Sequence, residues 1–225
     1  MKTAKKLLIF LLLVSALLPK AQAAEEKWVA LTFDDGPSEW TQTLLDGLAE
    51  REVTATFFLC GCQIRAYPEQ ASAVARAGHE LGVHGYSHEY FHRMTDEALR
   101  EELSSTAELI GDPTLLRPPG GIFRENTEEV CRERGWPVIL WSLDPEDWDP
   151  KQRKYTVSRV VQGAKNGDII LLHDLSAQNA QSALSCIDRL KEKGFRFCTV
   201  SELAEKAGVT MEPGKIYRSF PFELP

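Results

Sequence analysis

The stretch of sequence that decides the fold is WVALTFDDGP, residues 28–37. Its apolar run is typical of a strand buried on both faces of a parallel sheet. Asp34 and Asp35 follow the run directly, and Gly36 and Pro37 then form a turn. Neighbouring side chains on a strand point in opposite directions, so the two carboxylates can do different work. No glycine-rich loop follows this strand, and paired carboxylates would repel phosphate, which excludes a nucleotide site here.

The rest of the chain alternates similar strands with helices. Apolar runs predict seven strands, at 28–33, 54–59, 80–83, 115–117, 138–143, 168–172 and 196–199. Helical patterns lie between and after them, at 41–50, 69–77, 95–110, 126–134, 156–164, 179–193 and 201–207. This alternation builds either an open doubly wound sheet or a closed barrel. Polar residues follow strands around the whole rim, which favours a distorted (β/α) barrel of about seven strands, in the α/β class.

Five polar clusters lie at the ends of predicted strands and form the candidate site. They are Asp34 with Asp35, His84 with His88, Arg117, Asp144 with Asp147, and His173. The C-terminal ends of parallel strands share one face, so residues far apart in sequence can meet there. The clusters together indicate one hydrolytic metal site.

The histidine pair is the strongest metal signal. His84 and His88 are four residues apart, which suits one face of a helix, although nearby glycines favour a loop or a single turn. Two imidazoles and a carboxylate suit catalytic zinc, and imidazole also accepts cobalt and other first-row divalent ions. His79 and His92 have no such neighbours, and we expect structural or surface roles for them.

The remaining clusters carry charge around the expected metal. His173 follows an apolar strand, which places it at the rim as a candidate general acid. A nearby carboxylate, from Asp147 or Asp144, would keep its imidazole protonated and oriented. Arg117 can pair with Asp34, and the prolines after Arg117 stiffen its loop.

The N-terminus is typical of a secretory signal peptide. Lysines precede an apolar run at 7–18, and Ala21-Gln22-Ala23 is a small-residue cleavage pattern. A membrane anchor is the alternative, but the run is short of the roughly 20 residues that a spanning helix needs. We therefore expect a signal at 1–23 and one domain at 24–225 that ends in a short C-terminal tail. The protein would be secreted or associated with the cell wall, with a membrane tether if the signal is retained.

Composition limits the classes of function that the protein can have. The 225 residues are 43% hydrophobic and 26% charged, as expected for one globular domain. The formal net charge is −7, and removal of residues 1–23 with their four lysines and no acids makes it −11. Such an acidic chain disfavours nucleic acid as a partner. We predict no stable protein partner.

The five cysteines are odd in number, so at least one stays unpaired within the chain. Cys60 and Cys62 are separated by one residue rather than the two of common thiolate motifs, and we expect them to be small buried residues. Cys186 and Cys198 are the best candidates for a disulfide. Cys131 has no predicted partner.

These motifs resemble those of a known family, the polysaccharide deacetylases of carbohydrate esterase family four, which share the NodB homology domain. The resemblance covers residues 28–207 and rests on five motifs in order. They are TFDDGP at 32–37, His84 with His88, Arg117-Pro118-Pro119, Asp144 with Asp147-Trp148, and LLHD at 171–174.

The resemblance implies a role for each matching residue. Asp35, His84 and His88 would bind the metal, Asp34 would be the general base and His173 the general acid. Arg117 would hold Asp34 and Asp147 would tune His173. The Gly120 backbone N–H would stabilise the oxyanion, Leu172 would line the acetyl pocket, and Trp148 would contact the substrate.

The chain departs from the family pattern at two glycines. Gly85 stands where members usually carry Ser or Thr, so a hydroxyl that could support the metal loop is lost. Gly120 stands where an aromatic residue is common, so a ring that could line the sugar groove is lost. The first change puts metal retention in question, and the second puts substrate affinity and specificity in question.

The expected function is hydrolysis of N-acetyl groups on an amino-sugar polysaccharide, with peptidoglycan N-acetylglucosamine or N-acetylmuramic acid as the leading substrate and zinc as the leading metal. Chitooligosaccharide deacetylase and acetylxylan esterase are alternatives with the same chemistry. A non-catalytic cell-wall glycan-binding protein is a further alternative. A binding module, however, has no need for this set of carboxylates and imidazoles together.

Overall fold

The computed structural model of the chain describes residues 26–222. Its strands are β1 (Lys27–Asp34), β2 (Thr56–Leu59), β3 (Glu80–Val83), β4 (Leu115–Leu116), β5 (Val138–Ile139), β6 (Ile169–His173), β7 (Phe195–Cys198) and β8 (Ile216–Tyr217). They form one sheet in the order β6-β1-β2-β3-β4-β5-β8, with β7 paired to the first half of β1. All of the named strand pairs are parallel. The α/β fold and its seven predicted strands are confirmed.

The sheet curls far enough for its two sides to meet. Leu143, beyond the end of β5, forms a parallel bridge with Ile170 of β6. The backbone N–H of Ser142 donates to the carbonyl of Ile169 at 3.0 Å. The predicted strand 138–143 is therefore interrupted: its first residues pair within the sheet and its last residues contact β6. This contact makes the sheet a distorted barrel with a shared rim.

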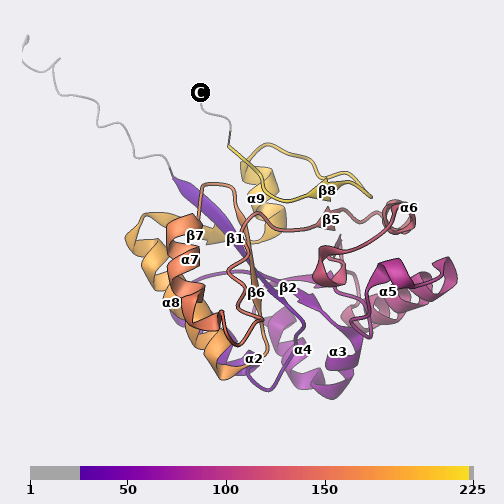
Figure 1. Cartoon of the computed structure of the whole chain (residues 1–225), viewed down its shortest axis with the longest axis horizontal. Helices are drawn as coiled ribbons and strands as arrows, with labels where there is room; N and C mark the ends of the chain where they lie inside the picture. The colour runs from indigo at the N-terminus through magenta and orange to yellow at the C-terminus, as the bar shows by residue number, and fades with distance from the viewer. Residues whose placement is uncertain (1–25, 223–225) are drawn as a thin grey trace, which may run out of the picture.

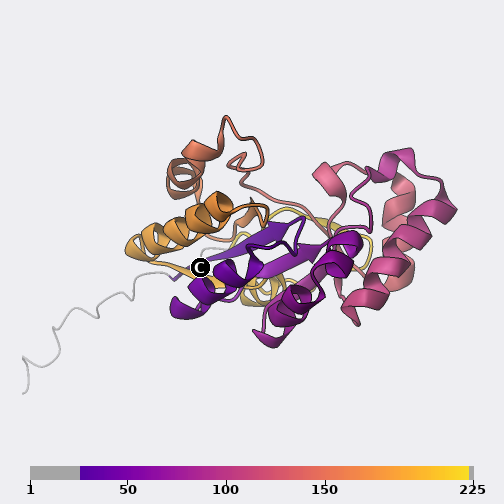
Figure 2. The same ribbon diagram turned by 90° about the horizontal axis from the view of Figure 1, so that it is seen from below.

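The helices surround the strands, as the two views show (Figures 1 and 2). They are α2 (Thr41–Glu50), α3 (Gly61–Ala66), α4 (Pro68–Arg76), α5 (Asp96–Ile110), α6 (Glu125–Arg134), α7 (Thr156–Gly163), α8 (Ala177–Glu192) and α9 (Val200–Lys206). Three short 3₁₀ turns are η1 (Phe91–Arg93), η2 (Pro119–Gly121) and η3 (Arg153–Tyr155). The seven predicted helices are confirmed to within two residues at each end. The sequence patterns missed α3 and β8, which are too short to show a period.

Side chains of β1 alternate between two packed layers. Val29, Leu31 and Phe33 pack outward in a cluster that includes residues of α2 and α8, whereas Ala30 belongs to a second cluster. Period-two alternation therefore aims Thr32 and Asp34 to the same side as Ala30. Asp34 ends the strand at the rim, where it lies in register with His173 of β6.

All five cysteines are free, so the predicted Cys186–Cys198 disulfide is wrong. The physical reason is that Cys186 packs in the outer cluster, whereas Cys198 packs in the cluster on the other side of the sheet. Cys60 is buried as expected, but Cys62 is exposed on α3.

The predicted signal at 1–23 lies outside the described residues. Within residues 26–222, no helix is long and apolar enough to cross a membrane.

Candidate functional site

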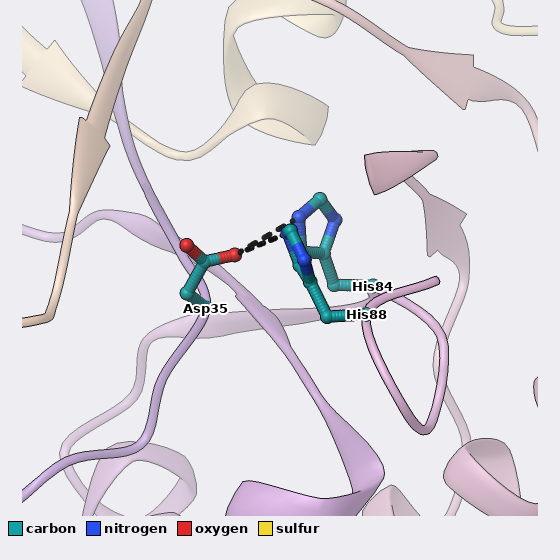
Figure 3. A group of neighbouring side chains, drawn as sticks. All are labelled: Asp35, His84 and His88. Atoms are coloured by element: carbon teal, nitrogen blue, oxygen red, sulfur yellow. Dashed lines mark ion pairs between the residues drawn. The ribbon is translucent and has the colours of Figure 1, made fainter. Parts of the chain in front are cut away.

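Three predicted ligands converge at the rim of the barrel (Figure 3). Asp35 follows β1, and His84 and His88 come from the loop after β3. Asp35 Oδ1 lies 2.9 Å from His88 Nε2 and 3.3 Å from His84 Nε2. The three ligand atoms all lie within 4.8 Å of one another. The loop geometry, rather than a helix, brings the two imidazoles together.

Left-handed backbone conformations shape this loop and its partner. Asp35 has φ 71° and His88 has φ 64°, values that non-glycine residues rarely adopt. Gly85 between the histidines has φ 81°, which glycine adopts without strain. Strain of this kind concentrates at functional sites, where the surrounding structure holds it in place.

The hydrogen bond of His84 aims its other nitrogen at the triad. His84 is buried, and its Nδ1 lies 2.7 Å from the backbone carbonyl of Arg117. A carbonyl can only accept, so Nδ1–H donates, and in the neutral imidazole Nε2 then keeps a free lone pair on the side of Asp35, where a bound cation would accept it. This arrangement is the usual outer support of a metal-binding histidine.

The triad fits a divalent cation. Asp35 Oδ1 is buried and accepts no hydrogen bond, although two ring nitrogens lie close to it. Burial opposes ionisation of the Asp35 carboxyl, but its contacts with His84 and His88 outweigh burial and hold its pKa well below the usual range. A charged oxygen and two nitrogen atoms aimed at one point are the donor set of a catalytic zinc or a similar ion.

Glu102 of α5 holds the loop that carries the histidines. Its Oε1 accepts hydrogen bonds from the backbone N–H of Tyr86 at 2.8 Å and from the Ser87 hydroxyl at 2.7 Å. It also accepts from the backbone N–H of Ser87 at 2.5 Å. A Cβ added at Gly85 would come within 3.2 Å of this same oxygen. Glu102 therefore supports the loop beside the position where the family hydroxyl is missing, and sequence reasoning did not single it out.

Arg117 is fully buried and anchors Asp34. Its Nη1 donates to Asp34 Oδ1 at 2.7 Å and to the Thr32 hydroxyl at 2.6 Å. Its Nε and Nη2 donate to the carbonyls of Ile139 and Leu140, each at 3.1 Å. The predicted pair thus exists, and it leaves Asp34 Oδ2 beside the triad, 3.7 Å from His84 Nε2.

His173 is buried at the end of β6, and Asp147 holds it. The alternative partner, Asp144, instead accepts the backbone N–H of Glu146 at 2.7 Å. Burial opposes protonation of His173, but the contact with Asp147 outweighs it and raises the His173 pKa to about 9. Asn179 of α8, which sequence reasoning missed, donates to Asp147 Oδ2 at 2.8 Å. The pair is thus fixed on both sides.

A cleft of about 330 Å³ lies over these groups. It is lined by Asp34, Asp35, His84, His88, Tyr90, Gly120, Ile122, Trp141, Asp144, Trp148, Leu171 and His173. A second cleft, of about 700 Å³, lies between α3, α4 and α5 and is lined by aliphatic residues, a serine and two arginines. Only the first of these two clefts contains carboxylates and imidazoles.

The structure corrects one predicted lining residue. Leu171 lines the cleft, whereas Leu172 is 1% exposed and packs in the outer cluster. His173 faces the cleft, and alternation along β6 aims Leu171 to the same side and Leu172 to the opposite side. Gly120 and Trp148 line the cleft as expected, and Trp148 is 50% exposed.

Asp174, next to His173, shapes the turn after the carboxylates. It is buried and accepts hydrogen bonds from the hydroxyls of Ser38 and Thr41. A Cβ added at Gly36 would come within 2.9 Å of its Oδ2. Burial raises the Asp174 pKa, and the two hydroxyls oppose this. Asp174 thus positions the turn rather than entering the cleft.

The comparisons with known proteins agree with this site. Residues 21–139 match the model of the polysaccharide deacetylase family. The chain belongs to that family. The chain is therefore a hydrolase of the polysaccharide deacetylase class, and the resemblance seen in the sequence is confirmed.

Two relatives illustrate the similarity. The chain is 37% identical over 188 residues to a peptidoglycan-N-acetylglucosamine deacetylase of Bacillus cereus, covering 79% of this chain and 88% of the relative. It is 36% identical to the peptidoglycan-N-acetylmuramic acid deacetylase PdaC of Bacillus subtilis, covering 84% of this chain. The chain spans only 41% of PdaC, so it matches one part of that longer protein.

A solved structure shares the fold. A family 4 acetyl xylan esterase from Clostridium thermocellum, in complex with a cobalt ion, superposes with a TM-score of 0.77 at 29% identity. The match covers 87% of this chain and the whole of that chain. The distorted barrel is therefore the fold of a family that includes both amide and ester hydrolases.

Proposed function

We propose that the protein hydrolyses N-acetyl groups on the amino sugars of peptidoglycan, with a divalent cation held by Asp35, His84 and His88. One observation carries the proposal: Asp34 and His173 line the same cleft as the ligand triad, and each is held by its own charged partner. A base and an acid beside a metal site are the parts that amide hydrolysis requires. The two bacterial relatives, both named as peptidoglycan deacetylases, support the substrate class.

The side chains divide the proton transfers between them. When bound, the cation polarises the acetyl carbonyl and lowers the pKa of a water molecule. Asp34 accepts a proton from the attacking water at Oδ2, because Arg117 occupies Oδ1. His173, whose pKa is about 9, is protonated at neutral pH and donates its proton to the leaving nitrogen. The Gly120 backbone N–H donates to the developing oxyanion.

Zinc is the metal that we propose. Two imidazoles and one carboxylate form a three-residue set that leaves a position free, as catalytic zinc sites do. Elemental analysis of gently purified protein tests the identity of the ion. The Asp35→Asn variant, which weakens the ligand set, is the matched comparison.

A relative favours one of the two amino sugars. The chain is 37% identical to a protein of Bacillus cereus named as a peptidoglycan-N-acetylglucosamine deacetylase, and the match covers 88% of that relative. We therefore propose N-acetylglucosamine as the preferred residue.

Acetate release by the protein without residues 1–23 tests the function. The substrates are peptidoglycan, N-acetylglucosamine oligomers and acetylated xylan, each with and without a chelator. We expect chelator-sensitive release from the N-acetyl substrates, at least a hundredfold lower in Asp34→Asn and in His173→Ala. Asp112→Asn, an exposed site away from the cleft, is the control. Release from acetylated xylan alone would assign an esterase, and no release with metal bound would assign a binding role.

We also propose that residues 1–23 direct export and are then removed, which leaves the catalytic domain at 24–225. The lysines followed by an apolar run and a small-residue pattern support this. Mass spectrometry of the mature N-terminus is the test. A chain that retains Met1 at the membrane would contradict it.

A further inference from the structure

The side chain of Tyr90 occupies the space above Gly120. Gly120 lies in the loop after β4 with φ 61°, and Tyr90 lies between His88 and η1. A Cβ added at Gly120 would come within 2.8 Å of Tyr90 Cε1. Real Cβ atoms do not approach that closely, so a side chain at position 120 would require the Tyr90 ring to leave its present position. Both residues line the cleft of the proposed active site.

Neighbouring side chains hold the Tyr90 ring in place. Its ring stacks with that of His92, with centroids 5.7 Å apart and planes inclined by 29°. The guanidinium carbon of Arg93 lies 5.1 Å from its centroid. A ring fixed in this way loses little conformational freedom when it contacts a ligand.

We propose that the ring of Tyr90 forms one side of the cleft and positions the sugar there, where a side chain at position 120 would otherwise lie. This inference rests on the proposed function and deepens it by naming a residue that determines affinity for the saccharide. An aromatic ring with a polar tip suits the apolar face and hydroxyls of a pyranose. The proton transfers already belong to Asp34 and His173, so Tyr90 acts on binding and not on chemistry.

Replacement of the ring tests whether Tyr90 positions the sugar. In Tyr90→Ala, the KM for N-acetylglucosamine oligomers should rise on the order of tenfold, with kcat within about twofold, because an aromatic contact contributes binding alone. Tyr90→Phe keeps the ring, and its KM should stay within about twofold. Tyr155→Ala, which removes an exposed tyrosine outside the cleft, should match the unmodified protein.

A double-mutant cycle tests the exclusion between the two residues. Gly120→Ala strains the backbone equally in either background, so that strain cancels in the cycle. The clash with the ring does not cancel. We expect Gly120→Ala to raise KM more in the unmodified protein than in Tyr90→Ala. Equal effects in both backgrounds would overturn the proposed packing.

Binding measurements separate this inference from the proposed function. Titration calorimetry of the oligomer against Asp34→Asn, with and without Tyr90→Ala, reports affinity in the absence of turnover. If the unmodified protein releases no acetate, the proposed function is wrong. If Tyr90→Ala does not change the affinity for the oligomer, the proposed role of Tyr90 is wrong. Zinc affinity is measured in parallel, and a loss in Tyr90→Ala as large as the loss of sugar affinity would assign Tyr90 to the metal loop instead.

Discussion

Asp147 holds His173 through both of its carboxylate oxygens. Its Oδ1 lies 2.7 Å from His173 Nδ1, and its Oδ2 accepts the backbone N–H of His173 at 3.0 Å. The carboxylate therefore both positions His173 and stabilises the protonated form of its imidazole ring. Because the ring contact raises the His173 pKa to about 9, the pair links proton binding to the stability of the fold.

This linkage predicts how stability depends on pH. The folded-state pKa of His173 is about 9, above the ordinary value of 6.5. The pair thus stabilises the fold fully below pH 6.5, and this contribution is lost as the pH rises through about 9. The loss over that window is on the order of 3 kcal/mol. Urea unfolding of the metal-free protein should show this loss in the unmodified chain and a much smaller one in His173→Gln, where only His88, whose pKa Asp35 also raises, still titrates.

A second buried histidine provides the control. His79 accepts the backbone N–H of Ala55, and burial lowers its pKa. Because its folded-state pKa lies below the ordinary value of 6.5, the titration of His79 changes the stability of the fold only at pH values below about 6.5. His79→Gln should therefore keep the full loss of stability between pH 6.5 and 9. A parallel pH dependence in His173→Gln and the unmodified protein would contradict the link to Asp147.

Glu102 supports the metal loop without being one of the three ligands. Its removal should therefore lower the affinity for the metal although all three ligands remain. Glu102→Ala removes three hydrogen bonds to Tyr86 and Ser87. Changes in the outer support of metal ligands cost about 10–100-fold in affinity, and we expect that range for zinc by calorimetric titration.

The neighbouring Glu101 gives a matched variant on the same helix. It is exposed and contacts Ser105 rather than the loop. Glu101→Ala should bind zinc as the unmodified protein does. Equal affinities in Glu101→Ala and Glu102→Ala would show that the loop holds its shape without the carboxylate.

The sequence predicted the elements whose signal is local. Apolar runs and helical periods located β1 and α2, and strand ends located the polar clusters. Three-dimensional packing decided the rest. Leu171 and Leu172 are chemically alike, so only the facing direction of His173 tells which one lines the cleft. Asn179 of α8 contacts a residue 32 positions away, and Glu102 of α5 contacts residues 15 and 16 positions away, and no local pattern marks such contacts.

The cysteine environments predict thiol reactivity. Cys62 is exposed, whereas the other four thiols are buried. Burial raises the pKa of Cys131, Cys186 and Cys198 to about 12, which suppresses the reactive thiolate. A thiol reagent should modify Cys62 in the native protein and all five cysteines in denaturant. Fewer than five in denaturant, without reductant, would show that a disulfide forms.

Replacement of Arg117 should cause the largest loss of folding stability of any single change at the site. It is fully buried and donates to Asp34, to the Thr32 hydroxyl and to two backbone carbonyls. Arg117→Met fills similar space but leaves the Asp34 charge buried without a partner. Breaking a buried ion pair in this way costs about 3–5 kcal/mol, which urea unfolding measures directly.

Two comparisons separate the charge from the packing. Arg117→Met combined with Asp34→Asn removes both charges, so it should recover part of the lost stability. Arg100→Ala breaks an exposed pair with Glu133 and should change stability far less. If Arg117→Met alone were as stable as Arg100→Ala, the buried pair would contribute nothing to the fold, and its role would be confined to holding Asp34 for proton transfer.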